Sequence, residues 1–187
     1  MHDLKPVTAL GGNTPQVDTI GTIRIAENDN LALASVAARR GHEDACAGQL
    51  TSLLGATPDV GKAVLNDPEA GFWVGPDQWM IGAPLATHEA LADQLKGRFG
   101  ATASITEQTG AWVVFDVTGQ HMPDMCEILC NVPIRQMTAG DAQRTMIHQL
   151  GCFVIKRQDA DHIRILGPRA SAGSLHHALV TAAHAVA

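Results

Sequence analysis

Alternating apolar and polar residues predict most of the chain as short β-strands. Ile20, Ile23 and Ile25 indicate one short strand. Residues 31–39 alternate apolar and small side chains as a buried strand does, although their alanine content also fits a helix. Further strands are predicted near residues 63–65, 103–108, 111–117, 145–150, 152–157 and 162–166, with a polar corner at residues 158–161 between the last two.

Apolar residues at helical spacing predict four helices. They cover residues 42–54, 88–99, 123–130 and 172–187. Gly55 and Gly100 are expected to end the first two helices, because glycine tolerates the left-handed backbone of a C-cap. Thr87 and Ser171 are expected to cap the N-termini of the second and fourth.

The segment GFWVGPDQWMIGAP, residues 71–84, predicts an aromatic hairpin. Phe72 and Trp73 lie on its first strand, Trp79 lies on its second, and residues 75–78 form a turn that begins with Gly-Pro. Two of the three tryptophans therefore lie in fourteen residues that contain no nucleophile, base or metal-ligand set. Such a hairpin is typical of a core centre or an interface, and for the tryptophans core packing is the stronger expectation.

The order of elements predicts an α+β protein with mostly antiparallel sheets and helices packed on one face. Helices return after pairs of strands, which is typical of this class. Residues 1–19 are expected to form an irregular N-terminal arm. Residues 20–187 are expected to form a single α+β domain, which the pattern also allows to be divided into two intimately packed halves, 20–100 and 101–187.

Composition excludes several classes of protein. The net charge is −6 and the 13 Lys and Arg residues are scattered, so nucleic-acid binding is not expected. No apolar run approaches the about 20 residues of a membrane span, and the first residues do not read as a signal peptide. A cytoplasmic protein with four free cysteines, partly buried, is therefore predicted.

Candidate chemical groups are sparse. Adjacent helical residues point about 100° apart, so His176 and His177 cannot chelate one ion together. Cys126 and Cys130 share a helix face but lack the second ligand pair of a zinc site. We therefore expect surface or interface histidines and structural thiols, with no metal site, no catalytic residue and no cofactor-binding residue.

Two further features leave alternatives open. Arg169 stands in a small-residue segment, 167–174, at the start of a helix, where an anion could bind; an ordinary cap with Arg169 bound to a carboxylate is the stronger expectation. Glu107 and Asp116 are predicted on neighbouring strands and could face each other. Nineteen acidic residues make such a pair unremarkable, so it carries no catalytic assignment.

Six segments of the chain are informative together: LALASVAARRG (31–41), GFWVGPDQWMI (71–81), SITEQTGAWVVFDV (104–117), LCNVPI (129–134), RTMIHQLGCFVIKR (144–157) and LGPRASAGSLHHAL (166–179). In this order, from about residue 10 to the C-terminus, the chain resembles one protein family, the gamma subunit of bacterial heterotetrameric sarcosine oxidase.

The resemblance implies a subunit of an enzyme that oxidatively demethylates sarcosine to glycine. That reaction yields hydrogen peroxide and either formaldehyde or methylene-tetrahydrofolate. In the family, FAD and NAD belong to the alpha subunit, covalent FMN to beta and zinc to delta, and none is assigned to gamma. The implied partners are therefore the alpha, beta and delta subunits, and the implied role is non-catalytic support of assembly.

The same resemblance implies a relation to the folate-binding aminomethyltransferase fold. The chain lacks the K-G-C-[YF]-x-G-Q-E stretch of iron–sulfur-assembly members of that superfamily, and no folate-contacting acid is assignable. The alternatives are a free-standing folate-binding one-carbon protein, a gamma-type subunit of a related N-methyl amino acid dehydrogenase and a metal-dependent enzyme. Candidate contact elements are the arm, the hairpin and the C-terminal helix, with the residues Phe72, Trp73, Trp79, Arg169, His176 and His177.

Overall fold

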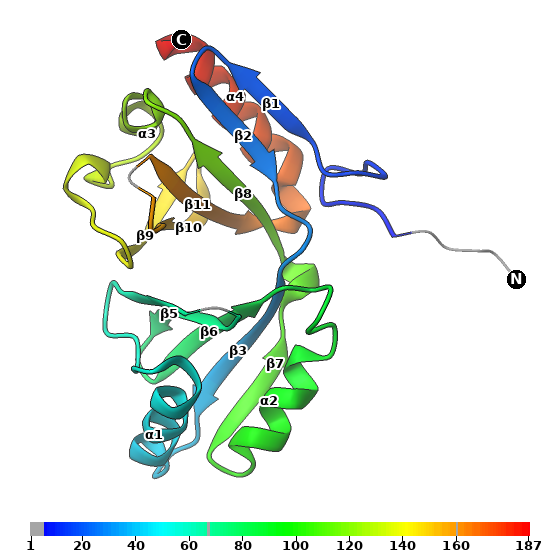
Figure 1. Cartoon of the computed structure of the whole chain (residues 1–187), viewed down its shortest axis with the longest axis vertical. Coiled ribbons are helices and arrows are strands. Elements are labelled where there is room, and N and C mark those ends of the chain that lie inside the picture. The colour runs from blue at the N-terminus through cyan, green and yellow to red at the C-terminus, as the bar shows by residue number, and fades with distance from the viewer. Residues whose placement is uncertain (1–5, 67, 160) are drawn as a thin grey trace, which may run out of the picture.

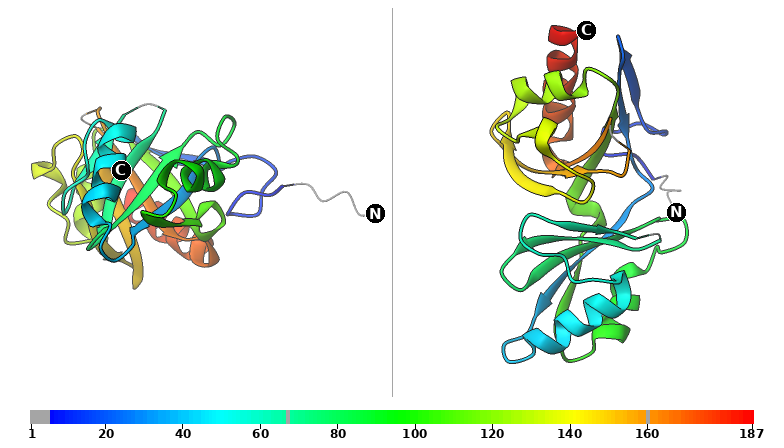
Figure 2. Two further views of the ribbon diagram at one scale, coloured as in Figure 1. Left: turned by 90° about the horizontal axis from the view of Figure 1, so that it is seen from below. Right: turned by 60° about the vertical axis from the view of Figure 1, so that its left-hand side comes forward.

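Two antiparallel sheets lie face to face, and helices cover the outer face of each (Figure 1). The computed structural model describes residues 6–66, 68–159 and 161–187. Each sheet with its helices forms one lobe, and the right-hand view of Figure 2 shows the resulting order of layers, helix–sheet–sheet–helix. The predicted α+β class, with antiparallel sheets and helices on one face of each, is confirmed.

Sheet A has six strands in the described part of the chain, in the order β1-β2-β8-β11-β10-β9. Its strands are β1 (Val17–Ile20), β2 (Ile23–Glu27), β8 (Trp112–Thr118), β9 (Ala142–Ile147), β10 (Leu150–Lys156) and β11 (His162–Pro168). The helices α3 (Met122–Leu129) and α4 (Ala172–Val186) lie on its outer face. Apolar side chains of every second strand residue, such as Val113 and Phe115, point toward these helices.

Sheet B has five strands over the same described residues, in the order β4-β5-β6-β3-β7. They are β3 (Ala32–Ala38), β4 (Ala63–Leu65), β5 (Ala70–Gly75), β6 (Gln78–Ala83) and β7 (Ala103–Glu107). The helices α1 (Glu43–Leu54) and α2 (Leu91–Phe99) cover its outer face, over a core that includes Trp79 and Phe99. Three short 3₁₀ turns, Thr109–Ala111, Ile134–Gln136 and Arg169–Ser171, complete the elements.

The chain changes sheets twice, so the lobes do not follow a simple division of the sequence. Strands β1 and β2 pair with the C-terminal strands of sheet A, while β7 pairs with β3 in sheet B. A division at residue 100 therefore separates strands that share one sheet. The strand β1 also begins inside residues 1–19, the predicted arm, of which residues 1–5 lie outside the described residues.

Most strand predictions are confirmed, and two are corrected. The single strand expected around Ile20–Ile25 is two strands, because Gly21 adopts φ +54° and reverses the chain. The strand expected at 145–150 is β9, which ends at Ile147, and the reversal lies at His148 and Gln149, both with positive φ. Non-glycine residues rarely adopt that conformation, so the sequence gives no signal for this turn.

The helix ends also differ in part from the predictions. Gly55 is the left-handed C-cap of α1, and Gly100 ends α2, as expected. Thr87 is not the N-cap of α2: the helix begins at Leu91, and the Thr87 hydroxyl bonds to His88 Nδ1 at 2.9 Å in the preceding turn. Ser171 does hold the N-cap position of α4, but its side chain makes no capping bond to any described residue. Within the described residues, no helix is long and apolar enough to cross a membrane.

Candidate functional site at the junction of the two lobes

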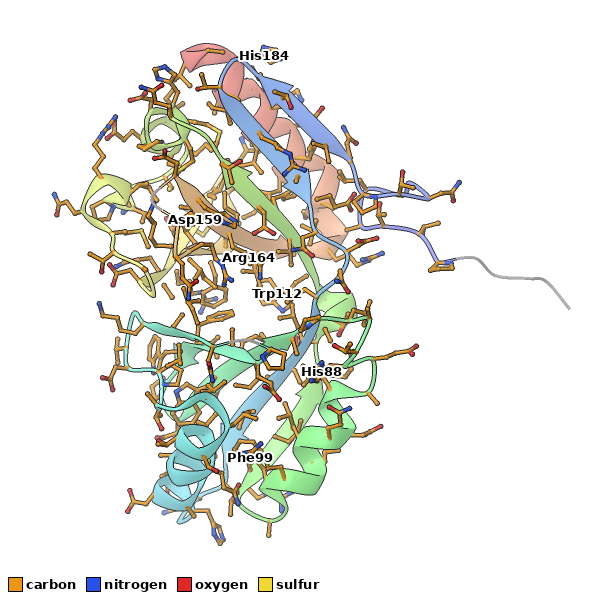
Figure 3. The ribbon with its side chains drawn as sticks, in the orientation of Figure 1. His88, Phe99, Trp112, Asp159, Arg164 and His184 are labelled. Carbon is orange, nitrogen blue, oxygen red and sulfur yellow. The ribbon has the colours of Figure 1, made fainter. Side chains whose placement is uncertain are left out.

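A cavity of about 520 Å³ opens where the arm, the β2–β3 connection and the start of β8 meet. Its apolar wall comes from Leu31, Leu33 and Leu85, and its size falls in the range of small-molecule sites. Trp112 also lines it, at the junction of the two lobes where Figure 3 labels that residue. We call this space the junction cavity.

The arm is tied over the junction cavity by Glu27. This side chain is only 5% exposed, and its two carboxylate oxygens accept the backbone N–H groups of Leu10 (3.0 Å) and Gln16 (3.1 Å). Arg169 adds a third tie, because its guanidinium donates to the carbonyl of Val7 at 3.0 Å. The backbone N–H bonds satisfy both oxygens of this buried carboxylate, so Glu27 acts as an anchor for the arm.

Trp112 contributes an unpaired hydrogen-bond donor to the cavity wall. Its Nε1 is buried and has no hydrogen-bond partner among the described residues. The ring packs 5.6 Å from the ring of Phe153, which in turn lies 5.1 Å from Phe72. An unpaired indole N–H costs about 1–3 kcal/mol, and groups of this kind in native structures often bond to water or a ligand.

A charged network borders the junction cavity on sheet A. Asp116 on β8 accepts two bonds from Arg164 (2.8 and 2.9 Å) and one from Asn28 (2.7 Å), and His162 Nε2 lies 3.1 Å away. Burial alone would raise the pKa of Asp116, but the bonds from His162, Arg164 and Asn28 and the Arg164 charge outweigh burial and hold that pKa well below its usual range. Asn28 also lines the cavity, so the network fixes one of its walls.

The polar groups of this region include two buried or half-buried carboxylates, an indole and a guanidinium. The carboxylates of Glu27 and Asp116 each accept hydrogen bonds from the chain itself at both oxygens. Among the described residues, no group of three His, Cys, Asp or Glu side chains is placed to hold a metal ion. The cavity itself offers the apolar wall, the Trp112 indole, the Arg169 guanidinium and the exposed Asp29 carboxylate.

The structure divides the predicted contact residues of the aromatic hairpin. Phe72 is 6% exposed and packs between the sheets, and Trp79 is 6% exposed and packs under α1 and α2, so both belong to the core. The Trp79 indole donates to the Pro58 carbonyl at 2.9 Å. Trp73 is half-buried against the same core. Phe72 and Trp79 were candidate contact residues; in this conformation they present almost no surface, because the chain covers them.

The other predicted contact residues lie in the sheet A lobe. His176 Nε2 is 2.7 Å from Asp18 Oδ2, so this side chain ties α4 to β1. Its neighbour His177 is exposed, as expected for two adjacent helical residues that point apart. Arg169 bonds to the Val7 carbonyl, and no carboxylate of a described residue pairs with it.

The four cysteines are free thiols, as predicted. Cys46, Cys126 and Cys152 are buried, and burial raises their pKa values to about 11, about 12 and about 11 respectively. Cys130 is the C-cap of α3 and is partly exposed. Thiols with raised pKa values are poor nucleophiles near neutral pH, so these cysteines act as core residues.

The sequence interpretation missed Glu27 and the network around Asp116. The sequence allowed Asp116 to face Glu107, but β7 and β8 belong to different sheets, so the two carboxylates do not pair. The available signal was the alternation of Arg164 and Asp116 with buried residues on their strands, which marks residues of the other sheet face. Glu27, directly after an apolar strand pattern, carried no such signal.

The fold places the chain in a known structural class, that of the aminomethyltransferase-like α+β proteins. The glycine cleavage system aminomethyltransferase T from Bartonella henselae superposes with a TM-score of 0.63 at 14% identity, covering 82% of this chain and 44% of that chain. No protein-family model matches the sequence, and no curated protein matches it either.

A more similar structure within this class is a heterotetrameric sarcosine oxidase. A chain of the enzyme from Corynebacterium sp. U-96, in complex with pyrrole 2-carboxylate, superposes with a TM-score of 0.74 at 19% identity. The match covers 90% of this chain and 87% of that chain, so the two are similar in extent. The relation expected from the six sequence segments is therefore confirmed at the level of the fold.

Proposed function

We propose that this chain is a gamma-type subunit of a heterotetrameric sarcosine oxidase and supports assembly of that complex. The observation that carries the proposal is the match, over nearly the whole of both chains, to a chain of such an enzyme. A structural match confined to one lobe could be explained by a shared supersecondary motif and would not support a common role of the two chains. Here the match covers 90% of the chain, which is more than either lobe contains by itself.

In this proposal the chemistry belongs to the other subunits. The complex oxidatively demethylates sarcosine to glycine, with FAD and NAD on alpha, FMN on beta and zinc on delta, and with formaldehyde or methylene-tetrahydrofolate as the one-carbon product. The gamma-type chain contributes buried contact area and carries no cofactor of its own. In this proposal the buried Glu27 carboxylate of the cavity wall serves to anchor the arm, since its two oxygens accept the N–H groups of Leu10 and Gln16.

Contact with alpha, beta or delta is proposed for residues that the chain leaves accessible. His177 and Thr181 lie on the exposed side of α4 and line a groove of about 440 Å³ beside α3. Trp73 and the arm are further candidates, since Trp73 is half-buried and Val7 is 54% exposed. His176 and Arg169 would act indirectly, by fixing β1 and the arm.

The test is co-expression of this chain with the neighbouring large and small subunits, followed by native mass spectrometry. We expect a flavin-containing complex that includes the chain, and a weaker complex for Thr181→Arg on α4. Gln94→Arg, an exposed site on α2 in the other lobe, is the matched control. A stable chain that does not bind these subunits would overturn the proposal.

The substrate of the complex needs a separate assay on the assembled enzyme. Related heterotetramers oxidise other N-methyl amino acids, and the gamma-type chain is not proposed to hold the amine. Turnover of sarcosine supports the named enzyme, whereas turnover of N-methylglutamate alone would indicate a related dehydrogenase with a similar small subunit.

A free-standing folate-binding protein is a second candidate, because the aminomethyltransferase-like fold here encloses the junction cavity. The cavity has an apolar wall and two acidic residues, Glu27 and the exposed Asp29. The test is a titration of the isolated chain with 5-formyl-tetrahydrofolate, in which the NMR signal of the Trp112 indole N–H is monitored. Saturable binding that Trp112→Phe weakens would favour this candidate, and an unchanged signal would exclude it.

A further inference from the structure

The junction cavity contains two opposite charges to which the described residues give no charged partner. Its charged lining residues are Glu27, Asp29 and Arg169. Glu27 is committed to the arm, because both of its oxygens accept backbone N–H groups. Arg169 donates to the neutral carbonyl of Val7, and no described carboxylate compensates its charge. Asp29 is exposed and makes no side-chain hydrogen bond or ion pair within the described part of the chain.

Asp29 and Arg169 flank the start of β8 from opposite sides. In sheet A, β8 lies between β2 and β11. Asp29 comes two residues after the end of β2, and Arg169 directly follows Pro168, which pairs with Trp112 at the start of β8. Since neighbouring strands lie about 4.8 Å apart, the two flanking backbones are about 10 Å apart. Trp112, which Figure 3 labels at the junction of the lobes, belongs to the strand between them.

A zwitterion is the ligand charge that matches this pair. A simple anion would bind Arg169 but meet the carboxylates of Asp29 and Glu27, and a simple cation would leave Arg169 uncompensated. An α-amino acid carries its ammonium and its carboxylate on one carbon. With a charge-assisted hydrogen bond of about 2.8 Å at each end, it bridges two side chains that reach toward each other from strands so spaced.

The rest of the junction cavity suits an apolar side chain. Leu31, Leu33 and Leu85 form its apolar wall, and its volume of about 520 Å³ leaves room for a branched aliphatic group. We propose that the junction cavity binds an α-amino acid with an apolar side chain. Arg169 binds the carboxylate, Asp29 binds the ammonium, and the leucines receive the side chain. This ligand site adds to the proposed assembly role and does not depend on it.

The test uses the full chain without other subunits, L-leucine as probe and ¹H–¹⁵N correlation spectra at constant ionic strength. We expect saturable shifts of the Trp112 indole N–H signal and of the amide signals of residues 29–33 below about 10 mM probe. Two analogues keep the side chain and lack one charge each: 4-methylpentanoate lacks the ammonium, and isoamylamine lacks the carboxylate. Each should bind at least about tenfold more weakly, because each loses one charge-assisted contact. The absence of saturable shifts with L-leucine, or equal binding of either analogue, would overturn the proposal and leave the assembly role untouched.

Substitutions assign each charge to one end of the ligand. Asp29→Asn should weaken L-leucine binding about tenfold without weakening 4-methylpentanoate, which has no ammonium. Because Asp29 is exposed and its side chain bonds to no described residue, this variant should keep the fold. Arg169→Gln, with folding checked by thermal melting, should weaken L-leucine and 4-methylpentanoate alike and leave isoamylamine unchanged.

Matched controls remove the same charges from the other lobe. Asp44→Asn on α1 and Arg98→Gln on α2 change exposed residues and should leave L-leucine binding unchanged. Equal losses in Asp29→Asn and Asp44→Asn would show an effect of net charge alone and would overturn the site. An unchanged affinity of Asp29→Asn for L-leucine would overturn it as well.

Discussion

Gly119 shows how one residue allows two segments of sheet A to meet. It adopts φ +125°, and a Cβ built there would lie 1.9 Å from the carbonyl oxygen of Thr22 in the β1–β2 turn. Both the backbone conformation and the space exclude a side chain. The β1–β2 turn therefore approaches the end of β8 only because this position is glycine.

Replacing Gly119 by alanine should destabilise the chain by about 3 kcal/mol or more, since the clash is with backbone and cannot be relieved by a rotamer change. Gly97→Ala is the control, because Gly97 lies in α2 with no atom within 4 Å of an added Cβ. That change should stabilise the chain by about 0.5–1 kcal/mol. Urea unfolding of both variants measures the contrast, and similar effects would contradict it.

Substitution of Trp79 and of Trp112 should reduce the free energy of unfolding by different amounts. Trp79→Phe removes the bond to the Pro58 carbonyl and leaves that buried oxygen unpaired, so we expect a loss of about 2–4 kcal/mol. Trp112→Phe removes ring volume but no hydrogen bond to a described residue, and should cost less. Denaturant unfolding gives both values. An equal or larger loss for Trp112→Phe would mean that its indole N–H has a partner in solution.

At the scale of elements, Asp116 joins three segments. It lies on β8, receives Arg164 from β11 and bonds to Asn28 in the β2–β3 connection, where the chain passes from sheet A to sheet B. The same connection is also held by the Asn28 N–H, which donates to the Val114 carbonyl at 2.8 Å, and by Asn30 Oδ1, which accepts the Ala86 N–H at 3.0 Å. The network therefore contributes to fixing the crossing between the lobes.

This network predicts a specific pH dependence. The pKa of Asp116 is lower in the folded chain than in the unfolded chain, so its contribution is complete above about pH 4 and is lost as pH falls further. Asp116→Asn should cost about 3 kcal/mol at neutral pH, because Arg164 loses its partner charge. The difference between wild type and variant should shrink as pH falls below about 4.

Urea unfolding at several pH values between neutral and about pH 3 measures this difference. Asp93→Asn is the control, since Asp93 forms an exposed pair with Lys96 on α2 and such pairs contribute little. A difference for Asp116→Asn that stays constant with pH would contradict the assignment of its low pKa.

At the scale of the whole molecule, one apolar cluster joins the lobes. Phe72 and Met80 from sheet B meet Phe153, Ile155 and Leu166 from sheet A between the two sheets. Each of these residues alternates with residues that face the helices of its own lobe. Each sheet therefore carries apolar residues on both of its faces, and both faces are buried where the lobes overlap.

Phe153→Ala should destabilise both lobes together. The ring contacts Phe72 across the sheets and Trp112 beside it, so we expect a loss of about 3–5 kcal/mol. Hydrogen exchange should rise in β6 and β10 alike, with one unfolding transition retained. Met146→Ala, at a side chain 57% exposed, is the control. Faster exchange in sheet A alone would show that the lobes unfold independently.

The sequence by itself determined the local elements. Glycine C-caps, the Gly-Pro turn of the aromatic hairpin and the spacing of apolar residues act within a few residues, so α1, β5, β6 and α4 follow from nearby residues. The α+β class also follows, because the order of elements restricts how faces can be buried.

Only the tertiary structure decided which strands share a sheet and which polar residues meet. β2 pairs with β8 across about ninety residues, and Asp116 meets Arg164 only through the register of β8 with β11. Glu27 gains its function from the arm that folds back over it. Such pairings depend on the summed burial of both sheet faces and on close approaches such as that at Gly119, which no local pattern encodes.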